Sequence, residues 1–318
     1  MDATTHLPVM CDEIVELFAP VPPGVVVDAT YGRGGHAAAL LQAHAHLRVV
    51  AVDRDPDAVR AAQARRDREP TLAPRLSVHH AHFDEVAPVL DALGVREISG
   101  ALFDLGVSSP QFDDPARGFS YRQDGPLDMR MDTTAPLRAA DVVNDYDEAR
   151  LAELIRTNAD ERFARRIARA IVAHRPVRST RELADIVTAA IPAPARRTGG
   201  HPAKRTFQAV RMEVNGELER LVGALDWALG ATVPGGRVAV LAYHSGEDRI
   251  VKRVLRAAER GPAAVVSPYV HEDRPRGGTV RRLRTPRHPS DAECARNPRA
   301  RSARLRAVER AAPAVVGV

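Results

Sequence analysis

The sequence contains little cysteine, few aromatic residues and almost no lysine. Its two cysteines in 318 residues are Cys11 and Cys294, and their separation fits neither a metal site nor a disulfide framework. No run reaches the roughly 18 consecutive apolar residues of a membrane span, and the first residues lack the basic-then-apolar pattern of a signal sequence. We therefore expect no metal site, no membrane partner and a cytoplasmic location.

Positive charge is present but unevenly distributed. The whole chain has a net charge of +5, and residues 271–310 hold twelve arginines against five acidic side chains, a local charge of +7. The remainder is therefore close to −2. A basic segment on a nearly neutral body is typical of binding to a polyanion such as RNA or DNA. A solvated tail is the alternative, because nearly every basic residue of the chain is arginine, as a genome-wide composition bias would also produce.

Strand-like and helix-like patterns alternate through the first hundred residues. This order predicts an α/β fold with a parallel, doubly wound sheet covered on both faces. We expect the second helix to begin with Asp55 as its cap and Pro56 at its first position. The expected strands are residues 25–30, 48–53, 76–80, 98–105 and, after a long interval, 237–245.

The alternation stops between the fourth and fifth expected strands. Residues 136–200 have apolar positions at helical spacing, and a single long helix is expected over 206–229. We therefore divide the chain into a sheet domain, residues 1–112 and 205–318, and an inserted all-helical domain, residues 113–204.

Residues 104–132 show neither helical nor strand periodicity. A segment of this length without periodicity inside a compact domain is usually either disordered or functional. Its apolar content favours an ordered loop, which Asp128, Arg130 and Asp132 are expected to fix through a salt network. The expected apolar anchors are Phe112, Phe119, Tyr121, Leu127, Met129 and Met131.

A glycine-rich turn follows the first strand. Gly32, Gly34 and Gly35 open the next helix, where the backbone can turn tightly and approach a ligand. Asp53 ends the second strand 21 residues after Gly32, where a carboxylate can accept both hydroxyls of a ribose. These features predict an adenosine-containing cofactor. They also satisfy a dinucleotide fingerprint, so a nicotinamide-dependent dehydrogenase is an alternative, although we find no catalytic His or Tyr/Lys pair for it.

Asp104, Ser108 and Ser109 end the fourth strand at the edge where ligands bind in such sheets. An exocyclic amine on a base has its lone pair delocalised into the ring. To attack a methyl group it needs a hydrogen-bond acceptor and a rigid pocket that aligns it. The three side chains are candidates for that role, and turn capping is the alternative.

Two further groups are candidates for binding the substrate. His244 and Ser245 line a base pocket or cap a helix. The other group is a phosphate-binding face on the helix whose Phe207, Val210 and Val214 are expected in the core. Its members are His201, Lys204, Arg205 and Arg211.

A series of motifs spans residues 6 to 310 and resembles one family. They are HLPVM at 6–10, ATYGRGGH at 29–36, VDRDP at 52–56, DLGVSSPQFDD at 104–114, RGFS at 117–120, GPLDMRMD at 125–132, ERFARRIARAI at 161–171, HPAKRTFQAVRMEVNGELE at 201–219, HSGEDRIVKR at 244–253 and NPRARSARLRAVER at 297–310. Together they resemble the RsmH (MraW) family of bacterial 16S ribosomal RNA methyltransferases, which modify N4 of a cytidine in the decoding region (P site) of the small ribosomal subunit.

The resemblance implies a class I fold that uses S-adenosyl-L-methionine, with 16S rRNA as partner and the inserted domain recognising the substrate. It places the cofactor contacts on Gly34, Gly35, His36, Asp53, Phe83, Asp104 and Gln111. The chain departs from the family at Tyr243, where phenylalanine is usual, and at Gly246, where leucine is usual, which is expected to affect packing behind the fifth strand and not activity. Tyr31 stands where phenylalanine or leucine is common and is expected to be tolerated. An assembly factor that binds RNA without catalysis is a third hypothesis. No sequence feature requires self-association, and a homodimer is left open.

Overall fold

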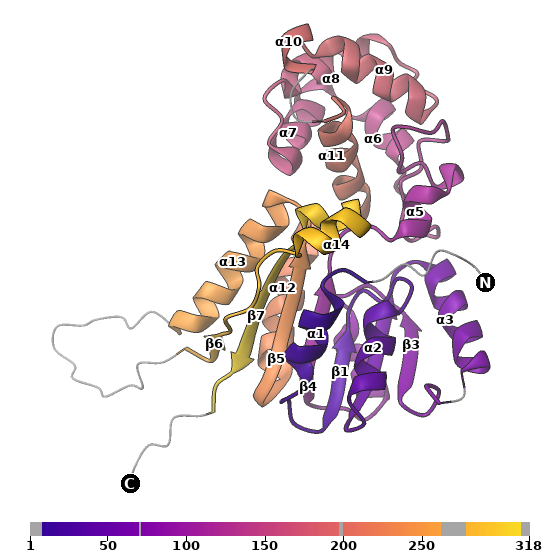
Figure 1. Cartoon of the computed structure of the whole chain (residues 1–318). Coiled ribbons are helices and arrows are strands. Elements are labelled where there is room, and N and C mark those ends of the chain that lie inside the picture. The colour runs from indigo at the N-terminus through magenta and orange to yellow at the C-terminus, as the bar shows by residue number, and fades with distance from the viewer. Residues whose placement is uncertain (1–7, 70, 197–199, 262–277, 313–318) are drawn as a thin grey trace, which may run out of the picture. The chain divides into compact units, whose positions relative to one another are not determined.

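The computed structural model describes residues 8–69, 71–196, 200–261 and 278–312. The chain forms two compact units (Figure 1). The sheet unit comprises Met1–Gly106 and Glu219–Val318, and the helical unit comprises Val107–Leu218. None of the described helices is long and apolar enough to cross a membrane.

The sheet unit is built on a seven-stranded sheet in its described residues, with strand order β3-β2-β1-β4-β5-β7-β6. The strands are β1 (Gly24–Asp28), β2 (Leu47–Asp53), β3 (Leu76–His80), β4 (Ile98–Asp104), β5 (Thr232–Ala242), β6 (Val280–Arg282) and β7 (Arg304–Arg310). The first five are parallel, and β7 runs antiparallel to both β5 and β6. The expected α/β class is confirmed, and the sheet is parallel from β1 to β5 as expected, but β7 makes it a mixed sheet.

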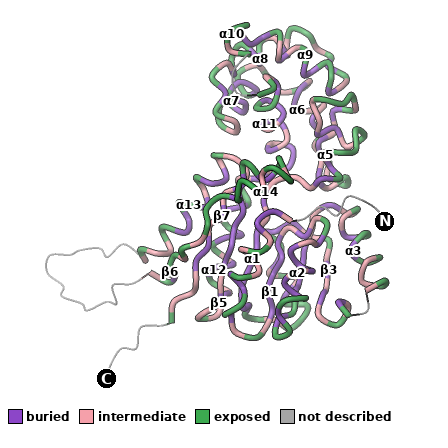
Figure 2. Tube along the Cα trace, viewed as in Figure 1, coloured by how far each residue is buried: buried purple, intermediate pink, exposed green. Residues whose placement is uncertain are grey.

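Helices cover both faces of this sheet, because successive strand residues point to opposite sides. Val25 and Val27 of β1 pack in one cluster, and Val26 between them packs in another. Burial therefore runs along the strands on both faces (Figure 2). The first face carries α4 (Val86–Ala92), α12 (Glu217–Ala231) and α13 (Ser245–Arg260), and the second carries α1 (Cys11–Phe18), α2 (Gly35–Ala43) and α3 (Pro56–Arg68). The expected cap of α3 is confirmed, because the Asp55 carboxylate accepts the Asp57 N–H at 3.0 Å.

The basic C-terminal segment is folded where the structure describes it. Residues 280–310 contain β6, the short helix α14 (Asp291–Arg296), a 3₁₀ turn (Pro298–Ser302) and β7. Leu305 and Ala307 of β7 are buried against the second face of the sheet. The solvated-tail interpretation is therefore wrong for this part, and residues 271–277 lie outside the described chain.

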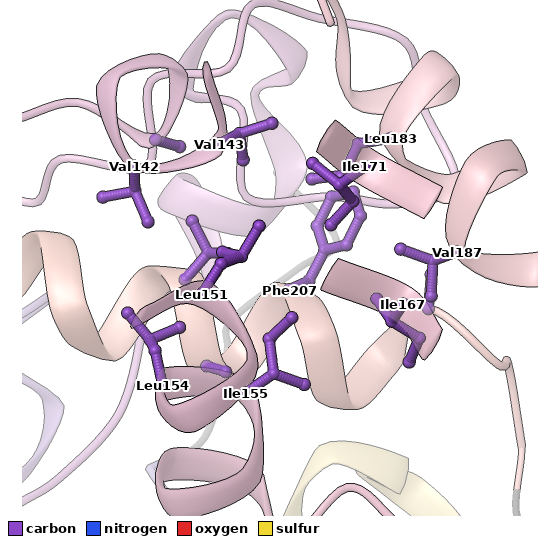
Figure 3. Packing of buried hydrophobic residues seen from close by; sticks show 14 of the residues in the cluster. Val142, Val143, Leu151, Leu154, Ile155, Ile167, Ile171, Leu183, Val187 and Phe207 are labelled. Carbon is purple, nitrogen blue, oxygen red and sulfur yellow. The ribbon is translucent and has the colours of Figure 1, made fainter. Parts of the chain in front are cut away.

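The helical unit packs its helices around one apolar core (Figure 3). Its elements are α5 (Ser109–Asp113), the 3₁₀ turn η1 (Pro115–Arg117), α6 (Ala139–Asp145), α7 (Glu148–Ala159), α8 (Ala164–Ala173), α9 (Thr180–Ala190), α10 (Ala193–Arg196) and α11 (Lys204–Asn215). Leu151 and Ile155 of α7, Ile167 and Ile171 of α8, and Phe207 of α11 meet in this core.

The prediction of a single helix over residues 206–229 is wrong. The structure has two helices there, separated by Gly216, whose φ of 58° is left-handed and whose N–H caps the end of α11. A glycine adopts this conformation without the strain that a Cβ brings. The first half packs with the helical unit through Phe207 and Val210. The helical unit accordingly spans 107–218, a wider range than the expected 113–204.

The aperiodic segment is ordered and anchored as expected. Phe119, Leu127, Met129 and Met131 are buried, and Phe112 and Tyr121 pack against the same core. The Asn215 side chain accepts the Met131 N–H at 2.9 Å and donates to the Met129 carbonyl at 2.8 Å.

A salt pair also holds this segment. The Arg130 guanidinium donates to both carboxylate oxygens of Asp128, at 2.9 and 2.8 Å, which confirms that part of the expected network. Asp132 accepts hydrogen bonds from the backbone and hydroxyl of Thr134. The segment is thus fixed by polar contacts as well as by apolar packing.

Candidate functional site

The carboxyl ends of β1, β2 and β4 define the candidate site of the sheet unit. β1 lies between β2 and β4, so the chain leaves it in one direction and returns on its other side. Ligands of open α/β sheets bind in the crevice at such a switch point. Asp28, Asp53 and Asp104 are the last residues of these three strands.

The glycine turn after β1 leaves no room for side chains. Gly34 has a φ of 69°, and a Cβ added to it would lie 2.3 Å from the Tyr31 ring. A Cβ on Gly35 would approach the Pro8 ring at 3.1 Å. The Gly34 N–H donates to the Tyr31 carbonyl at 2.7 Å, which closes the turn, and the absence of a Cβ at the start of α2 lets a ligand approach the backbone there closely.

Asp53 is bonded to this turn. Its Oδ2 accepts the Gly32 N–H at 2.6 Å, and its Oδ1 accepts the Asp55 N–H at 2.8 Å. A carboxylate offers about four acceptor positions, so two N–H donors leave capacity for a pair of ribose hydroxyls. Burial raises the pKa of Asp53 to about 6, although the two N–H groups act in the opposite direction.

Asp104 is held by side chains of three other segments. The Tyr243 hydroxyl donates to its Oδ1 at 2.7 Å, and His36 Nδ1 lies 3.5 Å from its Oδ2. Its backbone N–H donates to Thr30 Oγ1 at 2.6 Å. The ring of His36 is fixed in turn, because its Nε2 contacts the Val9 carbonyl at 2.9 Å. The structure therefore brings together His36 and Asp104, two of the expected site residues.

Tyr243, which replaces the phenylalanine usual in the family, contacts this carboxylate. A phenylalanine at that position has no hydroxyl to donate, so the hydrogen bond to Asp104 is a consequence of the tyrosine. Burial raises the pKa of Tyr243 well above its ordinary value. The hydroxyl therefore keeps its proton, and its role as donor, at neutral pH.

Asp28 is the most buried of the three carboxylates, with 2% of its surface exposed. Burial raises its pKa to about 7, and the nearby His36 and a hydrogen bond from the Thr30 N–H only partly oppose this. A cationic ligand bound beside it would favour its ionised form.

Phe83 follows β3, where the sequence placed a cofactor contact. Its ring packs edge-on against Phe103, with centroids 6.3 Å apart, and lies 4.0 Å from the ring of His82. No sequence pattern indicated His82, which is buried; its Nδ1 contacts Asp84 and its Nε2 has no hydrogen-bond partner among the described residues. Burial lowers the pKa of His82 to about 4. Such an unsatisfied nitrogen is costly, and a polar ligand could satisfy it.

Ser108, Ser109 and Gln111 belong to the helical unit. Ser108 is the N-cap of α5, and its N–H donates to Gln111 Oε1 at 3.0 Å in a capping box. Ser109 and Gln111 are buried. The capping geometry is thus present for Ser108 and Gln111, and the catalytic and cofactor-binding roles of these residues stay predictions.

His244 caps α13, which favours the capping interpretation of that region. Its Nδ1 accepts the Glu247 N–H at 3.3 Å. In return Glu247 Oε2 accepts the N–H groups of Tyr243, at 2.8 Å, and His244, at 3.2 Å. This capping box orients Tyr243, which directly follows the end of β5.

Several arginines of the C-terminal segment are committed to intramolecular ion pairs. Asp248, which is buried, accepts hydrogen bonds from Arg304 at 3.0 Å and from Arg306 at 2.7 and 3.1 Å. Glu309 likewise binds Arg237 and Arg281. These arginines fasten β7 to the sheet and to α13.

The expected phosphate-binding face in the helical unit is partly corrected. Lys204 and Arg205 are exposed, and the His201 ring stacks on Tyr121 with centroids 4.5 Å apart. Arg211 does not belong to this face, because its side chain is 12% exposed and its guanidinium donates twice to Glu217, at 2.8 Å each.

Residues 3–311 match the model of the MraW methylase family. The chain belongs to this family. Among similar curated proteins, "Ribosomal RNA small subunit methyltransferase H" of Thermobifida fusca is 50% identical over 97% of this chain and 94% of its own. The protein of that name from Frankia alni is 52% identical over 97% and 96%. A solved rRNA methylase from Streptococcus thermophilus aligns over 95% of this chain and 94% of its own, at 13% identity and a TM-score of 0.42.

Because the chain belongs to the MraW methylase family, the alternative of a nicotinamide-dependent dehydrogenase is wrong. The family depends on S-adenosylmethionine, and the residues of the sheet unit fit this cofactor. The glycine turn has no Cβ at Gly34 and Gly35, Asp53 keeps acceptor capacity for a ribose, and a bound sulfonium or ammonium would favour the ionised carboxylates of Asp28 and Asp104.

Proposed function

We propose that this protein transfers a methyl group from S-adenosylmethionine to N4 of a cytidine in the decoding region (P site) of 16S rRNA in the small ribosomal subunit. The names of relatives that are about half identical over nearly the whole chain support the substrate. The observation that most supports methyl transfer to an amine is the position of the Asp104 carboxylate, which Tyr243 and His36 fix at the switch point of the sheet.

The cofactor contributes an electrophilic methyl group on a positively charged sulfur. In the proposed reaction the N4–CH₃ bond forms as the CH₃–S bond breaks, and N4 then loses one proton. No covalent enzyme intermediate is needed.

Asp104 is proposed to accept a hydrogen bond from the target amine, which localises the nitrogen lone pair for attack. The Tyr243 hydroxyl already donates to its Oδ1, so we propose that Asp104 mainly orients the amine and that the proton leaves to solvent afterwards. We assign the same orienting role to Ser108 and Ser109, to be tested by substitution.

Cofactor binding is proposed for the set expected from the sequence. It consists of Gly34, Gly35, His36, Asp53, Phe83, Asp104 and Gln111. Asp53 would bind the ribose hydroxyls, and the two glycines would let the ligand approach the backbone.

The target cytidine must leave its stack to reach the site. We propose that the inserted helical domain recognises the RNA around it. Exposed arginines of the C-terminal segment, such as Arg296 and Arg301, would contact phosphates, whereas Arg304 and Arg306 are already bound to Asp248. An rRNA substrate would place the protein in the cytoplasm with the ribosome.

The test is incubation of the protein with labelled S-adenosylmethionine and small ribosomal subunits that lack the modification. Nuclease digestion and mass spectrometry then locate the label. Label on the N4 amine of one decoding-region cytidine is expected. Binding of the subunit with no transfer of label would instead support the non-catalytic assembly factor.

A further inference from the structure

Helix α8 of the helical unit exposes a row of arginines. Arg165, Arg166 and Arg169 are exposed, and Arg162 is exposed just before the helix begins. Their spacing of three and four residues places them along one side of the helix. The opposite side carries Ile167 and Ile171, which are buried in the core of the unit (Figure 3). We call these four arginines the α8 arginine row.

The row has little internal counter-charge. Arg169 lies 3.6 Å from Glu148, and its side chain is still 78% exposed. Arg165 and Arg166 form no hydrogen bond or ion pair with any described residue. The preceding acid, Glu161, is buried and contacts Arg205 and the Phe163 N–H instead. Like charges three and four residues apart on a helix repel, so an external anion would stabilise this face.

An open hollow lies at the beginning of α8. Its volume is about 550 Å³, and it is lined by Arg162, Phe163, Pro192, Pro194 and Ala195. The Arg162 guanidinium carbon lies 4.6 Å from the centroid of the Phe163 ring. Among the described residues the walls are thus apolar and aromatic with one cation, and none of these lining residues is a carboxylate. Unpaired nucleobases are bound by stacking on aromatic rings and on guanidinium planes.

We propose that the hollow and the α8 arginine row together bind a single-stranded segment of RNA. One base enters the hollow against Phe163 and Arg162, and the neighbouring phosphates lie on Arg165, Arg166 and Arg169. The adjacency of a stacking surface and a cationic row favours RNA over an acidic protein, because a peptide has no flat base for the hollow. The identification of this RNA as the rRNA substrate rests on the proposed function.

The phosphate contacts are tested with the full-length protein and a fluorescent single-stranded oligonucleotide of decoding-region sequence. Fluorescence anisotropy gives the Kd at several salt concentrations. For Arg165→Gln with Arg166→Gln we expect roughly tenfold weaker binding at about 0.1 M salt, and a salt slope smaller by about 1.4, from two lost phosphate contacts. Circular dichroism checks that the variant is folded.

The matched control is Arg156→Gln with Arg181→Gln. It removes the same charge from the same unit, at exposed arginines that already have acidic partners, Glu153 and Asp124. This control is expected to bind RNA nearly as the unchanged protein does. An unaltered salt slope in the α8 variant, or an equal loss in the control, would overturn the proposal.

The stacking contact is tested at Phe163. Phe163→Leu keeps an apolar side chain against the core and removes the aromatic face. We expect binding about 5- to 100-fold weaker, the range measured for a lost base–aromatic stack, with the salt slope unchanged. Phe163→Tyr should restore the affinity. Full affinity in the leucine variant would show that the hollow takes no base.

The results distinguish this inference from the proposed function. Methyl transfer by the unchanged protein, together with normal RNA binding by the α8 variants, would overturn only the proposal that the hollow and the α8 arginine row form an RNA-binding face. Weaker RNA binding by those variants in a protein that transfers no methyl group would support the face and contradict the proposed function. If the variants lost affinity for small subunits but not for the oligonucleotide, the face would contact a ribosomal protein, which would also overturn the inference.

Discussion

Asp28, Asp53 and Asp104 end three neighbouring strands, yet their surroundings differ. Asp28 is buried, with a pKa raised to about 7. Asp53 is bonded to the glycine turn, and Asp104 is held by Tyr243 and His36. The sequence predicted Asp53 and Asp104 at one edge, because the carboxyl ends of parallel strands share an edge, whereas Asp28 was expected inside its strand. It could not show their partners, because a side chain's contacts depend on segments far away in the chain.

Asp53→Ala removes the carboxylate proposed to bind the ribose. We expect the Kd for S-adenosylmethionine to rise about 10- to 100-fold, the effect of losing hydrogen bonds to a charged group. Isothermal titration calorimetry measures it. Asp91→Ala, on the exposed side of α4, is the control and should bind normally. Unchanged affinity in the Asp53 variant would contradict the assignment.

Asp28→Asn should change the pH dependence of stability. Because the folded-state pKa is raised, the contribution of Asp28 is fully present below its unfolded pKa near 4 and is lost as pH rises through about 7. The asparagine variant cannot ionise. Its free energy of unfolding relative to the unchanged protein should therefore increase between pH 5 and 8, by on the order of 3 kcal/mol. Urea titrations across this range measure the difference, and a constant difference would exclude the raised pKa.

Tyr243→Phe removes one hydroxyl and keeps the ring. Asp104 loses the donor at its Oδ1, so we expect the free energy of unfolding to fall by about 1–2 kcal/mol. Urea denaturation at pH 7 is the measurement. A variant as stable as the unchanged protein would show that the hydrogen bond has no net effect on folding, and the tyrosine would then be a packing residue only.

At the scale of elements, the largest difference from expectation is the break at Gly216. The apolar spacing is helical on both sides of this residue, so periodicity alone predicts one helix. The glycine was the available signal, since glycine is common in the left-handed cap of a helix. The break separates α11, which packs in the helical unit, from α12, which packs on the sheet.

Gly216→Ala tests this cap. The φ of 58° is unfavourable for any residue with a Cβ, so the substitution should destabilise the protein by about 1–2 kcal/mol. Gly223→Ala is the matched control, because Gly223 lies in the interior of α12 with no atom within 4 Å of an added Cβ. That variant should be about 0.5–1 kcal/mol more stable. Thermal unfolding distinguishes the two signs, and equal effects would exclude a left-handed cap.

β7 shows why the end of the sheet was missed. The run RLRAVER has alternating character, but its arginines resembled part of a basic tail. In the structure Leu305 and Ala307 are buried on one face, while Arg304 and Arg306 bind Asp248 on α13. The pairing of these arginines with Asp248, which is distant in the sequence, cannot be inferred from the residues of β7 themselves.

At the scale of the whole molecule, the order of β1 to β5 and the helical insert follow from periodicity and turn residues. Periodicity and turn residues are properties of short segments, so they can be read without knowing the tertiary contacts. The functional identity follows from long motifs such as GPLDMRMD, which local physics does not explain. The remaining features, namely the buried His82 and the hydrogen bond from Tyr243 to Asp104, arise only when the strands have assembled.

The central claim is methyl transfer to a cytidine amine of 16S rRNA, with Asp104 orienting that amine. Its most direct test is mass spectrometry of nucleosides from small subunits incubated with the protein and trideuteromethyl-labelled cofactor. We predict deuterated N4-methylcytidine at one decoding-region position, strongly reduced for Asp104→Ala. A labelled methyl group on carbon 5 of the base or on a ribose oxygen, or no label in the RNA, would contradict the account.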